Sequence, residues 1–410
     1  MNRYIVSSLI LVLFYNLIAC SADQSGLATA VLIRKTPVPV SSGETSPEEI
    51  LAAQAGFLTE VPENVNLQPA NLKIVYEKTG NLWISNQNGI SQLTLGGNDS
   101  RPQFSKDGNL VAFQRGKELW VANLSAGKER KLFGELGLTP LQFEFSDKNN
   151  NIVFTSGTMD GTPRFDLNIV DAENGDSRNL LPAGSGGTFT HDLTWETLTL
   201  VQPGMISSYV FDGSVKQEIY KFQPVLNVDP GYLPQIVWLE NGYGFNAVVP
   251  AASGLAARFI FLGKTGGMTA QIAEFVPISL ETSGYNISPD GSKIVYLKNL
   301  GDNFEMHVVD ASTADQTYFS MPRGNLGILG WSPDSKNIIY WLEDPRHLWI
   351  TSGKNNAPLV DVGSAENVMW LSNNSFLFSN ESELRLLNLG HPSKLILTDI
   401  TGNYDAISQP

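Results

Sequence analysis

Residue types that could perform catalysis or hold a metal are few in this chain of 410 residues, and they form no familiar motif. The four histidines are His191, His307, His347 and His391, and no pair has the His-x-His or His-Glu-x-x-His spacing that places two imidazoles on one metal. No Gly-x-Ser-x-Gly motif marks an activated serine. Asp171–Asp176 contains carboxylates but lacks the spacing and closing glutamate of a calcium loop, which favours a hairpin turn. We therefore expect no catalytic residues, no metal and no cofactor.

The composition indicates a folded, acidic protein. Lys and Arg number 27 against 41 Asp and Glu, a net charge of −14, and loss of Arg3 with a leader leaves 26 against 41, or −15. Such a surface repels a phosphate backbone, so nucleic acid is not an expected partner. Apolar residues make up 42% of the chain, enough for a core. The 37 Gly and 22 Pro are typical of many short strands joined by tight turns.

The start of the chain predicts an exported protein. Residues 1–19 have a positive beginning at Arg3 and an apolar stretch over 4–17, which is shorter than the roughly 20 residues of a membrane span and fits a secretory leader. Leu17-Ile18-Ala19-Cys20 resembles the bacterial lipobox, which implies cleavage before Cys20, acylation of that residue and attachment to a lipid bilayer. Ser21, in place of aspartate, favours the outer membrane of a Gram-negative cell, and otherwise the outer face of the cytoplasmic membrane. Cys20 is the only cysteine, so no internal disulfide can form.

A tether is expected over residues 20–70, which are rich in Ser, Thr, Ala and Pro and show no strand alternation. One short helix, 47–56, is predicted within it. Ser46 can cap this helix, Pro47 suits its first position and Glu49 completes a capping box. The predicted organisation is therefore a leader at 1–19, a tether at 20–70 and one folded body at 71–410.

The body repeats a short motif made of a strand end, a tight turn and an apolar strand. Its clearest copies are 104–113, 287–296 and 331–340, in which Pro presets the turn, Asp bonds back to the backbone and Gly accepts a positive φ. Weaker copies begin at Phe145, Trp195, Trp238 and Trp370, and a last fragment begins at Ile407. These eight landmarks are about 43 residues apart on average, the period of a four-stranded propeller blade.

The predicted fold is thus an all-β propeller of eight four-stranded blades, with seven blades as the alternative because the middle repeats are faint. The landmark near Ile407 has no outer strands after it, and strands over 72–95 precede the first landmark. Pairing of a strand over 401–408 with one over 72–77 would complete a blade from both ends of the body and remove two sheet edges.

These repeats resemble the TolB-like, WD-type propeller repeat, whose signature is Phe-Ser-Pro-Asp-Gly before an apolar strand. The resemblance covers about 67–410, strongly over 72–133 and 280–361 and faintly over 187–275. It implies a fold but no particular function, because propellers host many roles. Seven of the eight tryptophans fall at repeat positions, which favours packing between blades over a platform for stacking sugars.

A binding site, if present, is expected on the face where fourth strands lead into inner strands and second strands into third strands. The loops assigned to that face carry Arg101, Asp160, Arg164, His191, Tyr232, Asn303, Arg323, Arg346 and Tyr404.

The sequence therefore favours a monomeric, membrane-anchored, non-catalytic binding or scaffold lipoprotein that presents its propeller to a protein or a glycan. One alternative is a polysaccharide lyase or hydrolase that uses carboxylates in the propeller channel. Another is a component of envelope assembly.

Overall fold

The computed structural model describes residues 28–31, 38–39 and 72–408, apart from 135–136, 148, 159–163, 215, 226–232, 252–254, 280–283, 322–323, 343–346, 353–359 and 381. All regular structure in these residues is β-strand, with no helix among them. The leader, Cys20 and the predicted helix at 47–56 lie outside the described part of the chain.

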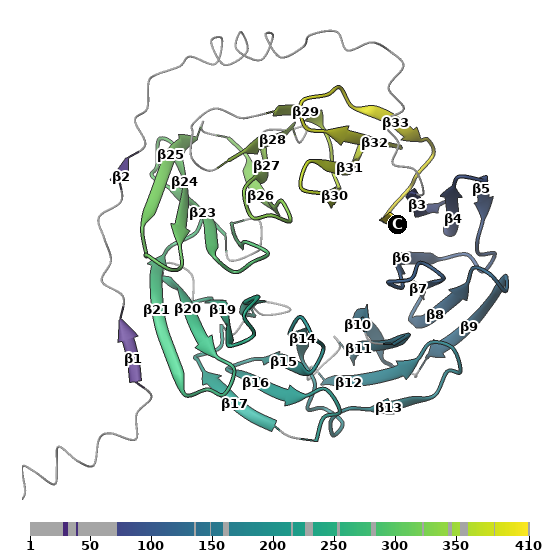
Figure 1. Cartoon of the computed structure of the whole chain (residues 1–410), viewed down its shortest axis with the longest axis horizontal. Helices are drawn as coiled ribbons and strands as arrows, with labels where there is room; N and C mark the ends of the chain where they lie inside the picture. Colours follow the sequence, from purple (N-terminus) through teal and green to yellow (C-terminus); the bar gives the residue numbers. More distant parts are fainter. Residues whose placement is uncertain are drawn as a thin grey trace, which may run out of the picture.

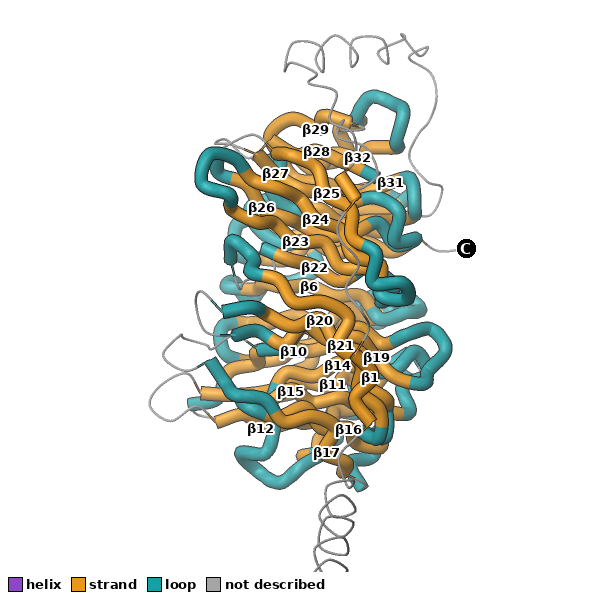
Figure 2. The backbone as a smooth tube through the Cα atoms, turned by 90° about the vertical axis from the view of Figure 1, so that its left-hand side faces the viewer, coloured by secondary structure: helices purple, strands orange, loops and turns teal. Residues whose placement is uncertain are grey.

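Eight antiparallel sheets stand around a common axis like the blades of a propeller, as Figure 1 shows. Seen from the side, the strands cross the thickness of the ring and their connections lie along both faces (Figure 2). We call the face with the fourth-to-inner and second-to-third connections the loop face, and the opposite one the turn face. The predicted eight-bladed, all-β propeller is confirmed.

The first four blades follow one another in the sequence, and each is given from its inner to its outer strand. Blade 1 is β34 (Tyr404–Ser408), β3 (Leu72–Lys78), β4 (Asn81–Asn86) and β5 (Gly89–Gln92). Blade 2 is β6 (Asp99–Phe104), β7 (Leu110–Arg115), β8 (Glu118–Asn123) and β9 (Lys128–Phe133). Blade 3 is β10 (Thr139–Phe145), β11 (Asn151–Thr158), β12 (Arg164–Asp171) and β13 (Ser177–Asn179). Blade 4 is β14 (Thr188–His191), β15 (Thr197–Gln202), β16 (Met205–Val210) and β17 (Lys216–Lys221).

The second half of the ring repeats this order. Blade 5 is β18 (Gln235–Trp238), β19 (Gly244–Val249), β20 (Ala257–Gly263) and β21 (Met268–Phe275). Blade 6 is β22 (Tyr285–Ile287), β23 (Lys293–Asn299), β24 (Phe304–Asp310) and β25 (Gln316–Met321). Blade 7 is β26 (Leu326–Trp331), β27 (Ile338–Leu342), β28 (His347–Thr351) and β29 (Val360–Ser364). Blade 8 is β30 (Val368–Ser372), β31 (Ser375–Asn380), β32 (Glu383–Asn388) and β33 (Lys394–Leu397).

The ring closes as the repeat arithmetic predicts. β34 pairs antiparallel with β3 from Leu72↔Ser408 to Tyr76↔Tyr404, so the last strand of the chain is the inner strand of blade 1. This pairing gives β3 a partner on both sides and makes β34 the strand nearest the axis.

Two short strands precede the propeller in the sequence and lie on its outside. β1 (Ala28–Val31) pairs in parallel with β21, and β2 (Val38–Pro39) pairs in parallel with β25. They extend blades 5 and 6 to five strands, so part of the segment expected to be a tether follows the rim of the ring (Figure 1). The outer strand of a blade offers unpaired backbone groups, and parallel pairing satisfies some of them.

The core lies between neighbouring blades. In one cluster Ile206 and Ile219 of blade 4 pack with Trp238 and Phe245 of blade 5. Trp331 ends its inner strand in the same way, is 6% exposed and donates from Nε1 to the backbone oxygen of Asn286 in the preceding blade. These contacts support the packing interpretation of the repeated tryptophans.

The repeated turn is held by its own polar residues. In blade 2 the Ser105 hydroxyl donates to Asp107 Oδ1 at 2.6 Å and accepts the backbone N–H of Leu110 at 2.9 Å. Burial alone would raise the pKa of Asp107, but hydrogen bonds from Ser105 and Asn109 outweigh burial, so its pKa lies below the usual value. Asp290 and Asp334 occupy the same position in blades 6 and 7 and have lowered pKa values for the same reason.

The register of blade 4 differs from the prediction by four residues. Its inner strand ends at His191, so His191 occupies the position that Phe104 has in blade 2, and Trp195 occupies the position of Gly108. The Trp195 N–H closes the turn on the Asp192 carbonyl, as the Gly108 N–H does on Ser105, and Trp195 has a φ of 54°. The prediction placed Trp195 at the end of the inner strand because the actual turn, residues 192–195, contains neither the Pro nor the Gly of the clear repeats.

Candidate binding site at the centre of the loop face

The structure places four of the nine predicted loop residues at the loop face. Arg101 is the third residue of β6, Arg164 the first of β12 and Tyr404 the first of β34, while Asn303 lies in the turn between β23 and β24. Asp160, Tyr232, Arg323 and Arg346 lie outside the described residues, as does Cys20.

His191 is not a loop-face residue, which corrects the prediction. It is the last residue of β14, beside the turn that leads into β15, and so it lies at the turn face. Its Nε2 is 3.0 Å from Glu144 Oε1 in blade 3 and its Nδ1 is 2.7 Å from the Asp192 carbonyl. The ring stacks on Trp195 with centroids 3.6 Å apart. The misplacement follows from the four-residue error in register.

His191 and Glu144 form a polar link between blades 3 and 4. Both ring nitrogens face oxygen acceptors, and only the doubly protonated ring can donate to both. Burial would lower the pKa of His191, but the hydrogen bonds to Glu144 and to the Asp192 carbonyl outweigh burial and raise the pKa above its usual value.

At the loop face, the closing of the ring brings Arg101 and Tyr404 into one polar cluster. Glu77 Oε1, at the end of β3, accepts the Arg101 backbone N–H at 2.8 Å and the Asn403 side-chain amide at 3.1 Å. The next residue, Tyr404, donates its hydroxyl to the Asn367 carbonyl at 3.0 Å. We call Glu77, Arg101, Asn367, Asn403 and Tyr404 the closure site, which joins blades 8, 1 and 2.

Arg101 has an unusual backbone. Its φ is 54°, in the left-handed region, and the β6–β7 register shifts between Ser100 and Gln103, so two residues of β6 stand opposite one of β7. Such a bulge redirects a side chain, and a non-glycine residue in this region costs of the order of 1–3 kcal/mol. The hydrogen bond from the Arg101 N–H to Glu77 holds this conformation.

The Arg101 guanidinium is fixed by neutral groups. Nη1 donates to Gln114 Oε1 at 3.2 Å and to the Pro140 carbonyl at 3.4 Å, and Nη2 donates to the Leu141 carbonyl at 3.0 Å. Its Cζ lies 5.1 Å from the ring centroid of Phe143. The residue is nevertheless exposed. Partial burial of the guanidinium lowers the pKa of Arg101, since desolvation disfavours the charged form.

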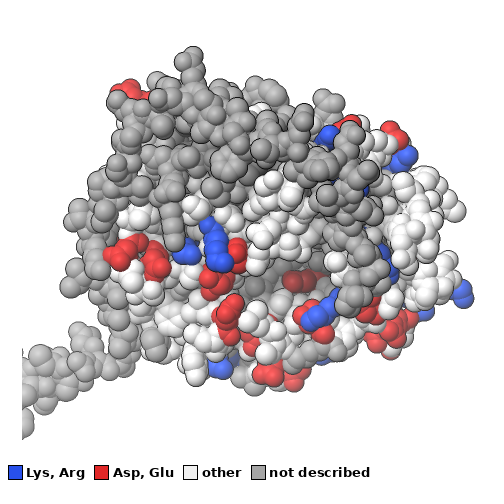
Figure 3. All heavy atoms as spheres, turned by 45° about the horizontal axis from the view of Figure 1, so that its top comes forward, with Lys and Arg blue, Asp and Glu red and all other residues white. Residues whose placement is uncertain are grey.

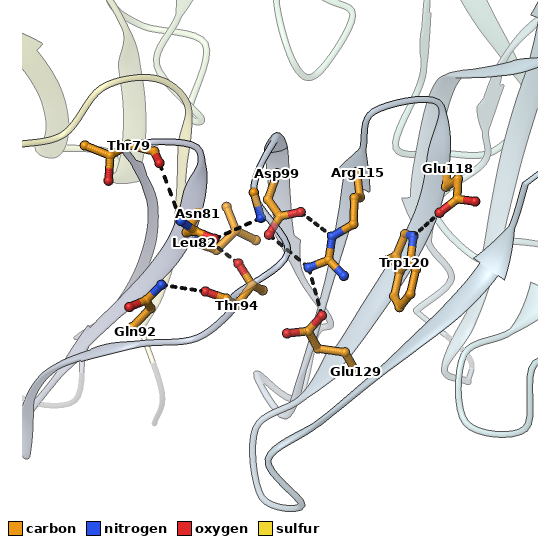
Figure 4. A network of polar contacts seen from close by, with 11 residues as sticks. Thr79, Asn81, Leu82, Gln92, Thr94, Asp99, Arg115, Glu118, Trp120 and Glu129 are labelled. Carbon is orange, nitrogen blue, oxygen red and sulfur yellow. Dashed lines mark hydrogen bonds and ion pairs between the residues drawn. The ribbon is translucent and has the colours of Figure 1, made fainter.

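Arg115, in the same blade, shows how this chain neutralises a structural arginine (Figure 4). Nε lies 2.6 Å from Asp99 Oδ1, Nη2 lies 3.0 Å from Asp99 Oδ2, and Nη2 lies 2.8 Å from Glu129 Oε2. The Asp99 side chain is fully buried. The Arg115 guanidinium also lies 4.5 Å from the ring centroid of Trp120. The hydrogen bond to Asp99 is the main cause of a raised pKa of Arg115, and together with the contact to Glu129 it outweighs burial, which would lower this pKa.

A largely buried carboxyl group lies beside the closure site. Asp405 Oδ2 accepts the Phe104 backbone N–H at 2.6 Å, which ties the inner strand of blade 1 to that of blade 2. Burial raises the pKa of Asp405 despite this hydrogen bond. Burial also raises the pKa of the neighbouring Tyr404 hydroxyl, which therefore stays protonated as a donor.

Acidic side chains mark the surface around the centre of the ring (Figure 3). Figure 3 shows a face of the ring with a hollow at its centre and acidic side chains gathered around it. Within the described residues, no group of three or more His, Cys, Asp or Glu is arranged to hold a metal. In the same part of the chain, no helix is long and apolar enough to span a bilayer.

The sequence did not single out Glu77, Asn367 or Asn403. Glu77 is the second-last residue of β3, and Asn367 and Asn403 directly precede β30 and β34. None of the three belongs to a motif, and Glu77 and Asn403 are 326 positions apart. Only the predicted pairing of β34 with β3 could have indicated that they meet.

Comparison with known proteins shows the fold. No protein-family model and no curated protein matches the chain. A crystal structure of the eukaryotic initiation factor is similar with a TM-score of 0.53 and 12% identity, over 81% of this chain and 85% of that one. A putative dipeptidyl aminopeptidase IV from Bacteroides ovatus has a TM-score of 0.52 and 12% identity, over 75% and 55%. TolB from Acinetobacter baumannii is a more distant neighbour, with a TM-score of 0.36 and 15% identity over 68% and 70%. The chain therefore shares its fold with the first two of these proteins, and likeness at 12% identity shows the fold alone.

Proposed function

We propose that this chain is an exported lipoprotein, anchored through Cys20, which uses its propeller as a monomeric, non-catalytic binding module for a protein or a glycan of the cell envelope. The observation that carries the proposal is the closure site, a set of fixed polar groups on a rigid ring. These groups can orient a polar ligand, and the site lies where loops of several blades converge.

The anchoring half of the proposal rests on Leu17-Ile18-Ala19-Cys20. Cells grown with a labelled fatty acid should incorporate label into the wild-type protein and not into a Cys20→Ala variant. Label that persists in this variant would contradict anchoring at Cys20. The conservative control is Ser21→Ala, which leaves the cysteine in place and should be labelled normally.

The binding half predicts a partner at the loop face. A photocrosslinking amino acid at Asn303 should give a discrete crosslinked species in intact cells. The same amino acid at Asp212, on the turn between β16 and β17 of the opposite face, is the matched control. Equal crosslinking from both faces, or consumption of a polysaccharide by the purified protein, would contradict a loop-face binding module.

A further inference from the structure

We propose that Arg101 is the receptor for a carboxylate group of the ligand at the closure site. The inference deepens the proposed binding function and rests on it. Arg101 is the exposed cation of this site, and its surroundings differ from those of the structural Arg115 in three ways.

The first difference is charge. The Arg115 guanidinium contacts two carboxylates, Asp99 and Glu129, whereas the described partners of the Arg101 guanidinium are one side-chain amide and two backbone carbonyls. Neutral acceptors fix the guanidinium plane but leave its positive charge uncompensated. An exposed cation held in this way attracts an anion from solution.

The second difference is which donors are occupied, since in Arg115 the edge formed by Nε and Nη2 already binds Asp99. A guanidinium has five N–H groups, and the three hydrogen bonds of Arg101 use both on Nη1 and one on Nη2. Nε–H and the second Nη2–H have no partner among the described residues. Nε and Nη2 form one edge of the guanidinium, which matches the two oxygens of a carboxylate in a bidentate pair.

The third difference is the strained backbone of Arg101. The bulge and the left-handed φ place the side chain against β10 instead of along β6, and Glu77 maintains this conformation through the backbone N–H. Because the guanidinium is already fixed on three acceptors and against Phe143, little side-chain freedom is left to lose on binding. Strain of this kind is found at ligand clamps.

The electrostatics select the class of anion. The Glu77 carboxylate accepts from the Arg101 backbone, and the chain has a net charge of −14. The site offers one uncompensated cation and two remaining N–H groups, which match the single charge and two oxygens of a carboxylate better than the two charges and additional oxygens of a phosphate. A carboxylate at the end of a ligand can approach the exposed edge of Arg101, while the fixed edge faces Pro140 and Leu141.

The test is a titration of the full chain, purified in detergent and labelled with ¹⁵N-arginine. The Arg101 Nε–H signal is assigned as the one lost in Arg101→Gln. Sodium acetate, at constant ionic strength made up with chloride, should shift this signal saturably at about millimolar concentration, and acetamide, the neutral analogue, should not. The exposed Arg130 of the opposite face is the matched control, so Arg130→Gln should leave the Arg101 shift unchanged.

Three outcomes would overturn the inference: no saturable shift with acetate, an equal shift with acetamide, or tighter binding of inorganic phosphate than of acetate. Arg101→Lys keeps the charge and loses the bidentate edge, so the variant should bind acetate at least tenfold more weakly, measured by the acetate dependence of its thermal midpoint. If acetate fails while crosslinking from Asn303 persists, the carboxylate inference is wrong and the proposed binding function stands. If crosslinking fails while acetate binds, the proposed function is the part in error.

Discussion

The buried ion pair between Asp99 and Arg115 gives a sharp prediction about stability. Asp99→Asn removes the buried carboxylate partner of Arg115, which is 17% exposed, and leaves the partly exposed Glu129 in contact with it. Removal of one member of a buried pair costs about 3–5 kcal/mol, and since Glu129 remains, we expect about 3 kcal/mol. Asp99 also begins the inner strand β6, so the loss falls on the strand that carries Arg101.

The assay is urea unfolding followed by tryptophan fluorescence, with a double-mutant cycle. Arg115→Met removes the charge and keeps an unbranched chain beside Trp120. The double variant should therefore be more stable than the sum of the two single losses predicts, by about 1–3 kcal/mol. The exposed pair of Lys106 and Asp147 is the control, and Asp147→Asn should cost less than about 1 kcal/mol. If the free energy of unfolding of Asp99→Asn lies within about 1 kcal/mol of the wild-type value, or if the two single losses simply add, then the ion pair of Asp99 and Arg115 does not stabilise blade 2.

Three further predictions concern closure and pH. A chain that ends at Asn403 lacks β34, and loss of its ladder and its buried side chains should lower the free energy of unfolding by about 5 kcal/mol; an unchanged urea midpoint would refute the role of β34. The pKa of Asp290 is lowered in the folded state, so this carboxylate stabilises the fold above its unfolded pKa, and the stabilisation is lost as the pH falls through the folded pKa. In Asp290→Asn, the free energy of unfolding should therefore fall less steeply as the pH is lowered. An equally steep fall in the variant and the wild type would contradict this. The pKa of His191 is raised in the folded state, so its contribution to stability is full below the unfolded pKa and is lost as the pH rises through the folded pKa. An NMR titration should place the His191 pKa above 6.5, and Glu144→Gln should lower it. No change of the His191 pKa in this variant would exclude Glu144 as the cause.

The sequence predicts the ring well because each clear repeat contains the residues that form its own turn. The Ser105 and Asp107 side chains and the positive φ of Gly108 build the turn within a few residues, so its copies can be found by inspection. The spacing of these turns then gives the number of blades and the closure by β34. Blade 4 was misaligned because Asp192 and Trp195 build the same turn from other residue types.

The closure site could not be predicted in the same way. Its members come from β3, β6, the start of β34 and the loop before β30, and they meet because the ring closes. Arg101 was selected as an exposed loop residue, but its bulge and its contacts with blade 3 depend on the tertiary structure. The partners of β1 and β2 are likewise distant in sequence, and nothing in residues 28–39 shows the alternation that marks a strand.

The pairing of β34 with β3 also sets the order of events during biogenesis. Because β3 is synthesised more than 300 residues before β34, the edge of β3 that later faces the axis has no partner while blades 2 to 8 are being made. Such an edge can recruit a strand from another chain, and contacts of this sequence separation form slowly. The interval between the synthesis of β3 and the arrival of β34 is therefore when this protein is most exposed to misassembly, and a chaperone that covered β3 during that interval would act where protection is most needed.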